Sequence, residues 1–123
     1  MIITLKGIVQ KNLGRGKELG YPTANIPAPS ESPEGIFVGY VTVRKQVLPA
    51  LIFIGPSITF DETDKKAEIY ILDFDSDIYD ETIYVEVREK LRDNIRFDST
   101  EELIVQMQED EENARNFFKK DAK

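Results

Sequence analysis

Hydrophobic and polar residues alternate with a period of two along most of the chain, which is typical of antiparallel β-strands. The alternation predicts five strands, at residues 4–9, 36–44, 46–54, 67–72 and 82–91. In the second of these, Ile36 and Val38 share one face while Phe37 and Val41 share the other. Two apolar faces indicate a barrel with an additional cover. Pro49 predicts an edge position or a bulge in the third strand, because proline has no N–H to donate.

The pattern changes to helical spacing at Ser99. Ser99 and Glu102 form the S-x-x-E pattern of a capping box. Apolar residues then recur at three- and four-residue intervals: Leu103, Ile104, Met107, Ala114, Phe117 and Phe118. One amphipathic helix of about five turns should therefore cover the barrel. We expect its acidic residues 109–112 to face solvent and residues 119–123 to fray.

Two connections stand out between these elements. Residues 13–34 hold three of the seven glycines and four of the six prolines, and a connection of that length in a small domain is uncommon unless it serves a binding site. Residues 73–77 have a D-x-D-x-D spacing, but Ile78 and Tyr84 stand where a calcium loop needs Gly and Glu. The second connection is therefore expected to be a hairpin turn.

Composition limits the chemistry that such a domain can perform. A chain of 123 residues builds one core, so residues 1–123 are expected to form a single domain. The absence of cysteine excludes disulfides and thiolate metal sites, and the absence of histidine excludes Ser-His and Cys-His catalysis. Carboxylates, lysines, hydroxyls, amides or a bound metal ion must carry any reaction.

Charge and hydropathy limit its partners. The net charge of −7 repels nucleic-acid phosphates, so no nucleic-acid partner is expected. The N-terminal residues do not resemble a signal peptide, and no apolar run reaches the roughly 18 residues of a membrane span. We therefore expect a cytoplasmic protein with no membrane partner.

The connection at residues 13–34 contains the sequence Gly-Arg-Gly-Lys-Glu-Leu-Gly, from Gly14 to Gly20. Glycines allow backbone N–H groups to approach a phosphate, and Arg15 and Lys17 add cationic donors. The segment is neither a Walker A motif, since Glu18 follows Lys17, nor a dinucleotide-binding fingerprint. Its composition fits phosphate binding and a ligand-free surface loop equally.

Three oxygen-bearing side chains are further candidates. Thr23 and Asn25 are spaced two residues apart after Pro22, and their hydroxyl and carboxamide oxygens suit a magnesium ion that takes its other ligands from phosphates and water. The alternative is that they only stabilise a local turn. Glu68 shares a strand face with Tyr70, where it is either a general base or a solvated carboxylate beside a lysine pair.

Together these residues resemble the riboflavin kinase (flavokinase) family, including the kinase module of bifunctional bacterial FAD synthetases. The segment from Gly14 through Pro22-Thr23-Ala24-Asn25-Ile26 looks like the family's glycine-rich loop and Pro-Thr-Ala-Asn signature. The resemblance covers nearly the whole chain through further matching segments: Pro33-Glu34-Gly35-Ile36-Phe37, Ile54-Gly55, Thr59-Phe60, Glu68, Leu72-Asp73-Phe74, Asp77-Ile78-Tyr79, Leu91-Arg92 and Phe97-Asp98-Ser99. It implies a six-stranded antiparallel Greek-key barrel with a C-terminal helix.

The resemblance also implies a reaction, transfer of the γ-phosphate of ATP to the 5′-hydroxyl of riboflavin to give FMN and ADP. Glu68 would be the base, and Thr23 and Asn25 would hold Mg²⁺. The nucleotide would contact six residues in all: Gly14, Gly16, Lys17, Thr23, Asn25 and Tyr79. The flavin would contact three residues near the last helix: Arg92, Ile95 and Phe97.

The chain departs from the family pattern at two positions and leaves two alternatives open, one of which is a barrel used only for protein contacts. Ile58 stands where the family usually has proline, and Asp80 stands where it usually has a turn glycine. Neither replaces a proposed ligand or base. The other alternative is a flavin or nucleotide sensor that kept the barrel and lost the chemistry. The chain has no room for an adenylyltransferase half, so we expect it to stop at FMN, and an upstream FAD synthetase domain would belong to a longer protein.

Overall fold

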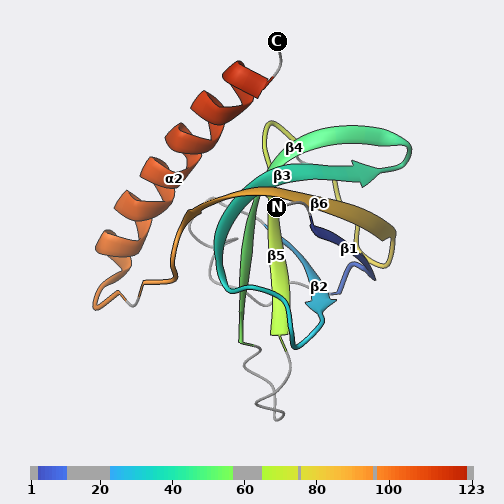
Figure 1. The fold of residues 1–123 in the computed structure, drawn as a ribbon, viewed down its shortest axis with the longest axis horizontal. Coiled ribbons are helices and arrows are strands. Elements are labelled where there is room, and N and C mark those ends of the chain that lie inside the picture. Colours follow the sequence, from blue (N-terminus) through green and yellow to red (C-terminus); the bar gives the residue numbers. More distant parts are fainter. Residues whose placement is uncertain (1–2, 11–22, 57–64, 75, 96, 122–123) are drawn as a thin grey trace.

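A computed structural model describes residues 3–10, 23–56, 65–74, 76–95 and 97–121. Within these residues the chain forms six strands and a C-terminal helix (Figure 1). The elements are β1 (Ile3–Ile8), β2 (Ala24–Ala28), β3 (Gly35–Val43), β4 (Gln46–Pro56), β5 (Lys65–Ile71), β6 (Thr82–Arg92) and α2 (Thr100–Asp121). Five of the strands match the predicted ones to within two residues at each end. No described helix is long and apolar enough to span a bilayer.

The strands form one antiparallel sheet in the order β1-β6-β3-β4-β5-β2, which curls into a nearly closed barrel. A bridge between Gln10 and Asn25 brings the two edge strands together. The predicted six-stranded barrel is confirmed. The predicted hairpin at residues 73–77 is wrong, because β5 pairs with β4 and β2 whereas β6 pairs with β1 and β3. Residues 72–81 are a crossover, so β5 and β6 each keep two other neighbours.

Alternating side chains build two apolar layers, as the sequence predicted. Phe37 and Val41 point into the barrel core with the interior residues of the other strands. Ile36 and Val38 lie on the outer face, where they pack with Ala114 of α2. Figure 1 shows α2 along one side of the barrel. The cover leaves the outer face beyond the helix open to other molecules.

Pro49 lies in an interior strand, yet at the end of one of its ladders. Ala50 pairs with Ile71, the last residue of β5, and the carbonyl of Pro49 then accepts a bond from the N–H of Leu72. The N and O atoms of one strand residue point to the same side, so the missing N–H of Pro49 falls just past the end of β5. The predicted edge position or bulge is therefore wrong, and the N–H is spared because the ladder with β5 ends here.

The helix begins with the predicted capping box. Ser99 Oγ accepts a bond from the N–H of Glu102, and Glu102 in turn accepts one from the N–H of Asp98. The helix continues to Asp121, so the fraying predicted for residues 119–123 is wrong at residues 119–121, and residues 122–123 lie outside the described part of the chain. The hydroxyl of Tyr40 on β3 donates to Asp121 at 2.5 Å, which holds this end of the helix against the sheet.

An ion pair ties the middle of α2 to the end of β6. Asp110 is 1% exposed and accepts two bonds from Arg92, at 2.8 and 2.6 Å, and a third from Gln106 at 3.0 Å. The prediction that residues 109–112 all face solvent is therefore wrong at Asp110. Met107, Asp110 and Ala114 share the buried stripe of the helix, and Asp110 remains there as a charged residue because Arg92 meets it.

We predict that Gly39→Ala destabilises the fold by about 3 kcal/mol. A Cβ at residue 39 would lie 2.0 Å from the carbonyl oxygen of Glu86, where a register shift brings β3 close to β6. Urea denaturation measures the change. Gly55→Ala is the matched control, since its Cβ would meet nothing nearer than 3.4 Å and should change stability by less than about 1 kcal/mol. Equal effects of the two substitutions would contradict the account.

Removing the buried carboxylate should also be costly. Asp110→Asn leaves Arg92, whose side chain is 17% exposed, without its counter-ion, and should lower the free energy of unfolding by about 3 kcal/mol. Asp73→Asn is the control, because it breaks the exposed pair with Arg115 and should cost less than about 1 kcal/mol. The ion pair would not anchor the helix if both variants unfolded at the same urea concentration.

The contact between Tyr40 and Asp121 should make stability depend on pH in the alkaline range. Burial and the hydrogen bond to Asp121 raise the pKa of Tyr40 to about 12, from an ordinary value near 10. Because the folded-state pKa is the higher one, the stability that the neutral phenol contributes is complete below about pH 10 and lost as pH rises toward 12. Chemical denaturation should show the parent losing stability relative to Tyr40→Phe over this interval. A difference that stays constant with pH would refute the assignment.

Candidate functional site

The site begins where β2 and β5 pair on the outer face of the barrel. Their register places Asn25 directly opposite Glu68. The neighbouring residues Ile26 and Ile69 are 0% and 1% exposed in the barrel core, so Asn25 and Glu68 point to the outer side. Residues paired in this way have Cβ atoms about 5 Å apart. Two of the predicted site residues, distant in sequence, are thus neighbours in space.

The same face carries a row of side chains across five strands. Glu68 is paired with Phe53 on β4, Phe53 with Ile36 on β3, and Ile36 with Arg92 on β6. With about 4.8 Å between adjacent strands, the row from Asn25 to Arg92 is about 19 Å long. It therefore links the predicted nucleotide side of the site to the predicted flavin side, with Glu68 between them.

Glu68 lies in a half-apolar environment. Its side chain is 28% exposed, and the nearest cationic atom recorded for it is Lys66 Nζ at 3.9 Å. Phe53 and Tyr70, its neighbours on the same face, belong to the partly buried apolar residues beneath α2. The carboxylate is exposed enough to reach a ligand, and apolar side chains stand beside it on the side toward Arg92.

Beyond Asn25, the same side of β2 leads to an open groove of about 770 Å³. Its lining comes from β1, β2 and the turn before β6: Lys6, Gly7, Ile8, Val9, Gln10, Pro27, Tyr79, Asp80 and Thr82. Pro27 lies two residues from Asn25 on the same face of β2. Ile8 and Tyr79, 54% and 57% exposed, give the groove apolar surfaces that no other described side chain covers fully.

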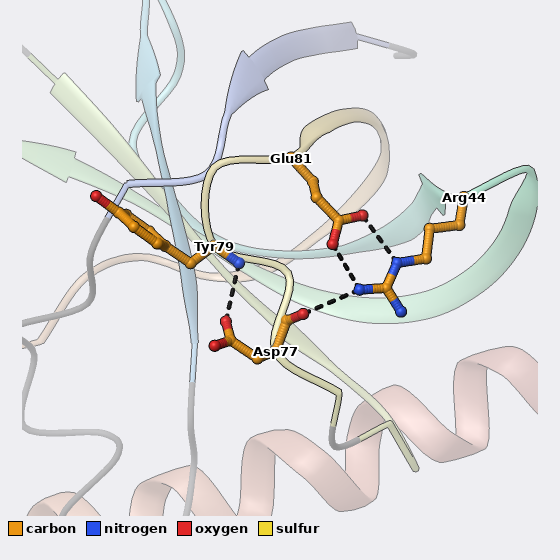
Figure 2. Close-up of polar contacts among 4 residues, drawn as sticks. All are labelled: Arg44, Asp77, Tyr79 and Glu81. Carbon is orange, nitrogen blue, oxygen red and sulfur yellow. Dashed lines mark hydrogen bonds and ion pairs between the residues drawn. The ribbon is translucent and has the colours of Figure 1, made fainter.

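The turn that carries Tyr79 is held by polar contacts on both sides. Asp77 Oδ1 accepts a bond from the N–H of Tyr79, and Arg44 binds both Asp77 and Glu81 (Figure 2). Asp80 has a φ of 70°, so its backbone is in the left-handed region that favours glycine, the residue usual in the family at this position. The hydrogen bonds from Arg44 lower the pKa of Glu81, so the carboxylate stays charged in this contact.

The opposite end of the row meets the segment between β6 and α2. Asn94 Nδ2 donates to the carbonyl of Ile54 at 3.3 Å, which attaches this segment to β4. Ile95 is 51% exposed and Phe97 is half-buried. Arg92 donates to Asp93 O as well as to Asp110, so its guanidinium is fixed at the edge of the site. The three residues predicted for the flavin thus occur together, with Arg92 held chiefly by the helix.

The rest of the predicted nucleotide site lies partly outside the described residues. Gly14, Gly16 and Lys17 fall there, as does Ile58. Described residues near both ends of the segment that contains the glycines are in contact, because the N–H of Gln10 donates to the carbonyl of Asn25 at 2.7 Å. Gln10 and Asn25, the described residues near the two ends of that segment, therefore lie next to each other.

Sequence reasoning missed several residues of this region, Phe53 and Asp110 among them. Phe53 was assigned only to a strand, because its place beside Glu68 depends on the register between β4 and β5. Asp110 was assigned to the solvent face of the helix. Its three- and four-residue spacing from Met107 and Ala114 was the signal that it shares their buried stripe.

Comparisons with known proteins place the chain in a family. The Flavokinase family, described as riboflavin kinase, matches residues 2–118. The trifunctional protein RibF/MnmA of Mycoplasmoides gallisepticum is 39% identical over 97% of this chain and 19% of its own length. The bifunctional riboflavin kinase/FMN adenylyltransferase of Listeria monocytogenes is 35% identical over 95% of this chain and 38% of its own length. The chain thus spans well under half of either relative.

A solved structure supports the fold independently. The crystal structure of riboflavin kinase from Trypanosoma brucei superposes with a TM-score of 0.70, at 23% identity, over 97% of this chain and 78% of that one. At this identity the likeness concerns the barrel and helix alone, whereas the family match rests on the sequence of nearly the whole chain. The chain belongs to the riboflavin kinase family.

Proposed function

We propose that residues 1–123 form one domain that transfers the γ-phosphate of ATP to the 5′-hydroxyl of riboflavin, giving FMN and ADP. The observation that carries the proposal is the register between β2 and β5, which sets Asn25 opposite Glu68. A phosphate-side oxygen ligand and a carboxylate are then adjacent, between the groove at Tyr79 and the apolar row toward Arg92. Membership of the riboflavin kinase family supports this assignment.

The nucleotide fits the groove side of the site. Its base would rest against Ile8 and Tyr79, whose exposed apolar surfaces suit a planar ring. Its phosphates would then run past Pro27 toward Asn25. Gly14, Gly16 and Lys17 would cover the phosphates with backbone N–H groups and one ammonium group.

Thr23 and Asn25 fit the needs of a magnesium ion that accompanies ATP. Their hydroxyl and carboxamide oxygens are hard donors, and the two-residue spacing places them on one side of the chain. Such an ion would take its remaining ligands from phosphates and water. When bound, Mg²⁺ would neutralise negative charge on the phosphates during transfer.

Glu68 would act as the general base. Its carboxylate accepts the proton of the 5′-hydroxyl as that oxygen bonds to the γ-phosphorus, and the bond from this phosphorus to the bridging oxygen of ADP breaks. The half-apolar setting beside Phe53 and Tyr70 limits water around the carboxylate. The protein otherwise contributes position, because phosphoryl transfer needs little covalent help from side chains.

The flavin would lie at the other end of the row. Its ring system would pack against Ile95 and Phe97 beside Arg92, in the segment that Asn94 attaches to β4. Phe53, which is partly buried, lies between that end and Glu68, whereas Ile36 is 3% exposed and packs beneath α2. In this position riboflavin would direct its ribityl chain toward the Glu68 carboxylate. The 5′-hydroxyl of riboflavin and the γ-phosphate of ATP would then reach Glu68 from opposite sides.

The proposal extends to partners and location. Riboflavin, FMN, ATP and ADP are the ligands. Nucleic acid is not one of them, given the net charge of −7. We place the reaction in the cytoplasm, as the sequence analysis expects. A preceding FAD synthetase domain in a longer protein would agree with the bifunctional relative, of which this chain spans only 38%.

The experiment is formation of FMN and ADP from riboflavin and MgATP, separated by chromatography. Glu68→Gln keeps the shape of the side chain but cannot accept the proton, so we predict that kcat falls at least about 100-fold. Binding of MgADP, measured by calorimetry, should change less than twofold. Glu112→Gln, on the exposed face of α2, is the control and should turn over like the parent.

Two outcomes would contradict the proposal. A folded parent that binds riboflavin and MgADP but makes no FMN would be the sensor alternative instead. A Glu68→Gln variant with parental kcat would show that the base is another group.

A further inference from the structure

The two-residue turn between β3 and β4 is built from unusual residues. Arg44 and Lys45 have φ values of 49° and 69°, both in the left-handed region. Hairpin turns of this kind strongly favour Asn-Gly or Asp-Gly, because a Cβ meets the following carbonyl oxygen when φ is positive. Neither arginine nor lysine relieves that contact. Both residues of this turn are therefore strained, although Asn-Gly or Asp-Gly would adopt the same conformation with less strain.

Arg44 makes contacts from this turn that Asn or Gly could not make. Its Nε donates to Glu81 Oε1 at 2.8 Å and its Nη2 to Glu81 Oε2 at 2.5 Å. Nη2 also donates to the carbonyl oxygen of Asp77 at 3.0 Å. The paired bonds to one carboxylate fix the direction of the guanidinium plane. Side-chain hydrogen bonding raises the pKa of Arg44 and lowers that of Glu81, so both partners remain charged.

The two residues that Arg44 holds lie on either side of Tyr79. Asp77 Oδ1 accepts the N–H of Tyr79 at 2.9 Å, and the N–H of Glu81 donates to the carbonyl of Ile78 at 3.1 Å. Figure 2 shows the Tyr79 ring on the far side of this turn from the guanidinium. Arg44 is not among the residues that line the groove, yet it restrains both ends of the turn that carries Tyr79.

The other side of the turn is attached to β1. The N–H of Val9 donates to the carbonyl of Glu81 and the N–H of Asp80 donates to the carbonyl of Val9, both at 2.9 Å. Val9 and Asp80 also line the groove. The position of Tyr79 over the groove thus depends on backbone bonds to β1 on one side and on Arg44 on the other.

We propose that Arg44 is a positioning residue for the nucleotide, acting through Glu81 and Asp77 on the turn that carries Tyr79. The inference rests on the proposed function, in which Tyr79 contacts the base of ATP. The competing explanation is an ordinary surface ion pair, since the Arg44 and Glu81 side chains are 51% and 33% exposed and such pairs add little to stability. The two explanations differ in what they predict for nucleotide binding.

The test compares Arg44→Gly with Lys45→Gly in the full chain. Both substitutions place glycine at a left-handed position and relieve its steric contact, so their melting temperatures should agree within about 3 °C. Only Arg44→Gly removes the guanidinium. We expect it to raise KM for ATP and Kd for MgADP about fivefold, a typical effect of losing charge-assisted hydrogen bonds. KM for riboflavin should stay within twofold, and Lys45→Gly should keep both KM values.

A second pair of variants checks that the effect passes through Glu81. Arg44→Lys keeps the charge but cannot bind the carboxylate with two N–H groups, so it should show most of the rise in KM for ATP. Glu81→Gln should raise the same constant. The double variant Arg44→Gly with Glu81→Gln should be no worse than Arg44→Gly alone, because both changes break one contact.

Each contrary result has a distinct meaning. The proposal is overturned if Arg44→Gly and Lys45→Gly have the same KM for ATP and the same Kd for MgADP. It is also overturned if Arg44→Gly raises KM for ATP and KM for riboflavin equally, or if it melts far below Lys45→Gly. If the parent itself makes no FMN, the proposed function fails instead. MgADP calorimetry then still decides the role of Arg44, since unchanged binding or no binding at all would reject it.

Discussion

The pairing of β2 with β5 is the constraint on which the rest of the site depends. Side chains alternate along a strand, so a shift of one residue in this pairing would turn Asn25 and Glu68 to opposite sides of the sheet. Ile26 and Ile69 oppose the shift, because both are buried in the barrel core and the one on the strand that turned over would have to leave it. The hydrophobic core thus sets the position of the two polar residues.

The same reasoning explains why the site extends along the outer face and not into the barrel. The interior is filled by aliphatic side chains, and the helix covers only part of the outside. Asp110 and Arg92 hold the helix at the end of β6, and the segment that follows Arg92 bends back to β4 through Asn94. Within the row, the Glu68 carboxylate stays partly exposed, whereas Asn25 and Ile36 are buried; the groove lies at one end of the row and the exposed Ile95 beyond the other.

Much of this arrangement follows from local patterns in the sequence, and the exceptions have physical causes. Period-two alternation located five strands and the capping box located the helix. Strand β2 was not found from alternation, because Pro27 and the neighbouring glycines and prolines mask its pattern and its core residues number only three. The six-strand count came from the family resemblance. The crossover at residues 72–81 was missed since turn residues alone do not tell which strands pair.

The site shows the same division. Thr23, Asn25 and Glu68 could be named as candidates from their chemistry, but their proximity depends on long-range pairing that a single sequence does not display. The prediction that Asp110 faces solvent relied on its charge and not on its spacing from Met107 and Ala114, which places it on the buried stripe of the helix. Arg44 carried no recognisable signal, since its contacts with Glu81 and Asp77 join segments more than thirty residues apart.

A crystal structure of the chain with MgADP and FMN would test the central claim most directly. The account predicts ADP in the groove beside Tyr79, magnesium bound by Thr23 and Asn25, and the phosphate end of FMN within hydrogen-bond distance of the Glu68 carboxylate. Ligands on another face of the barrel, or an FMN phosphate remote from Glu68, would contradict it.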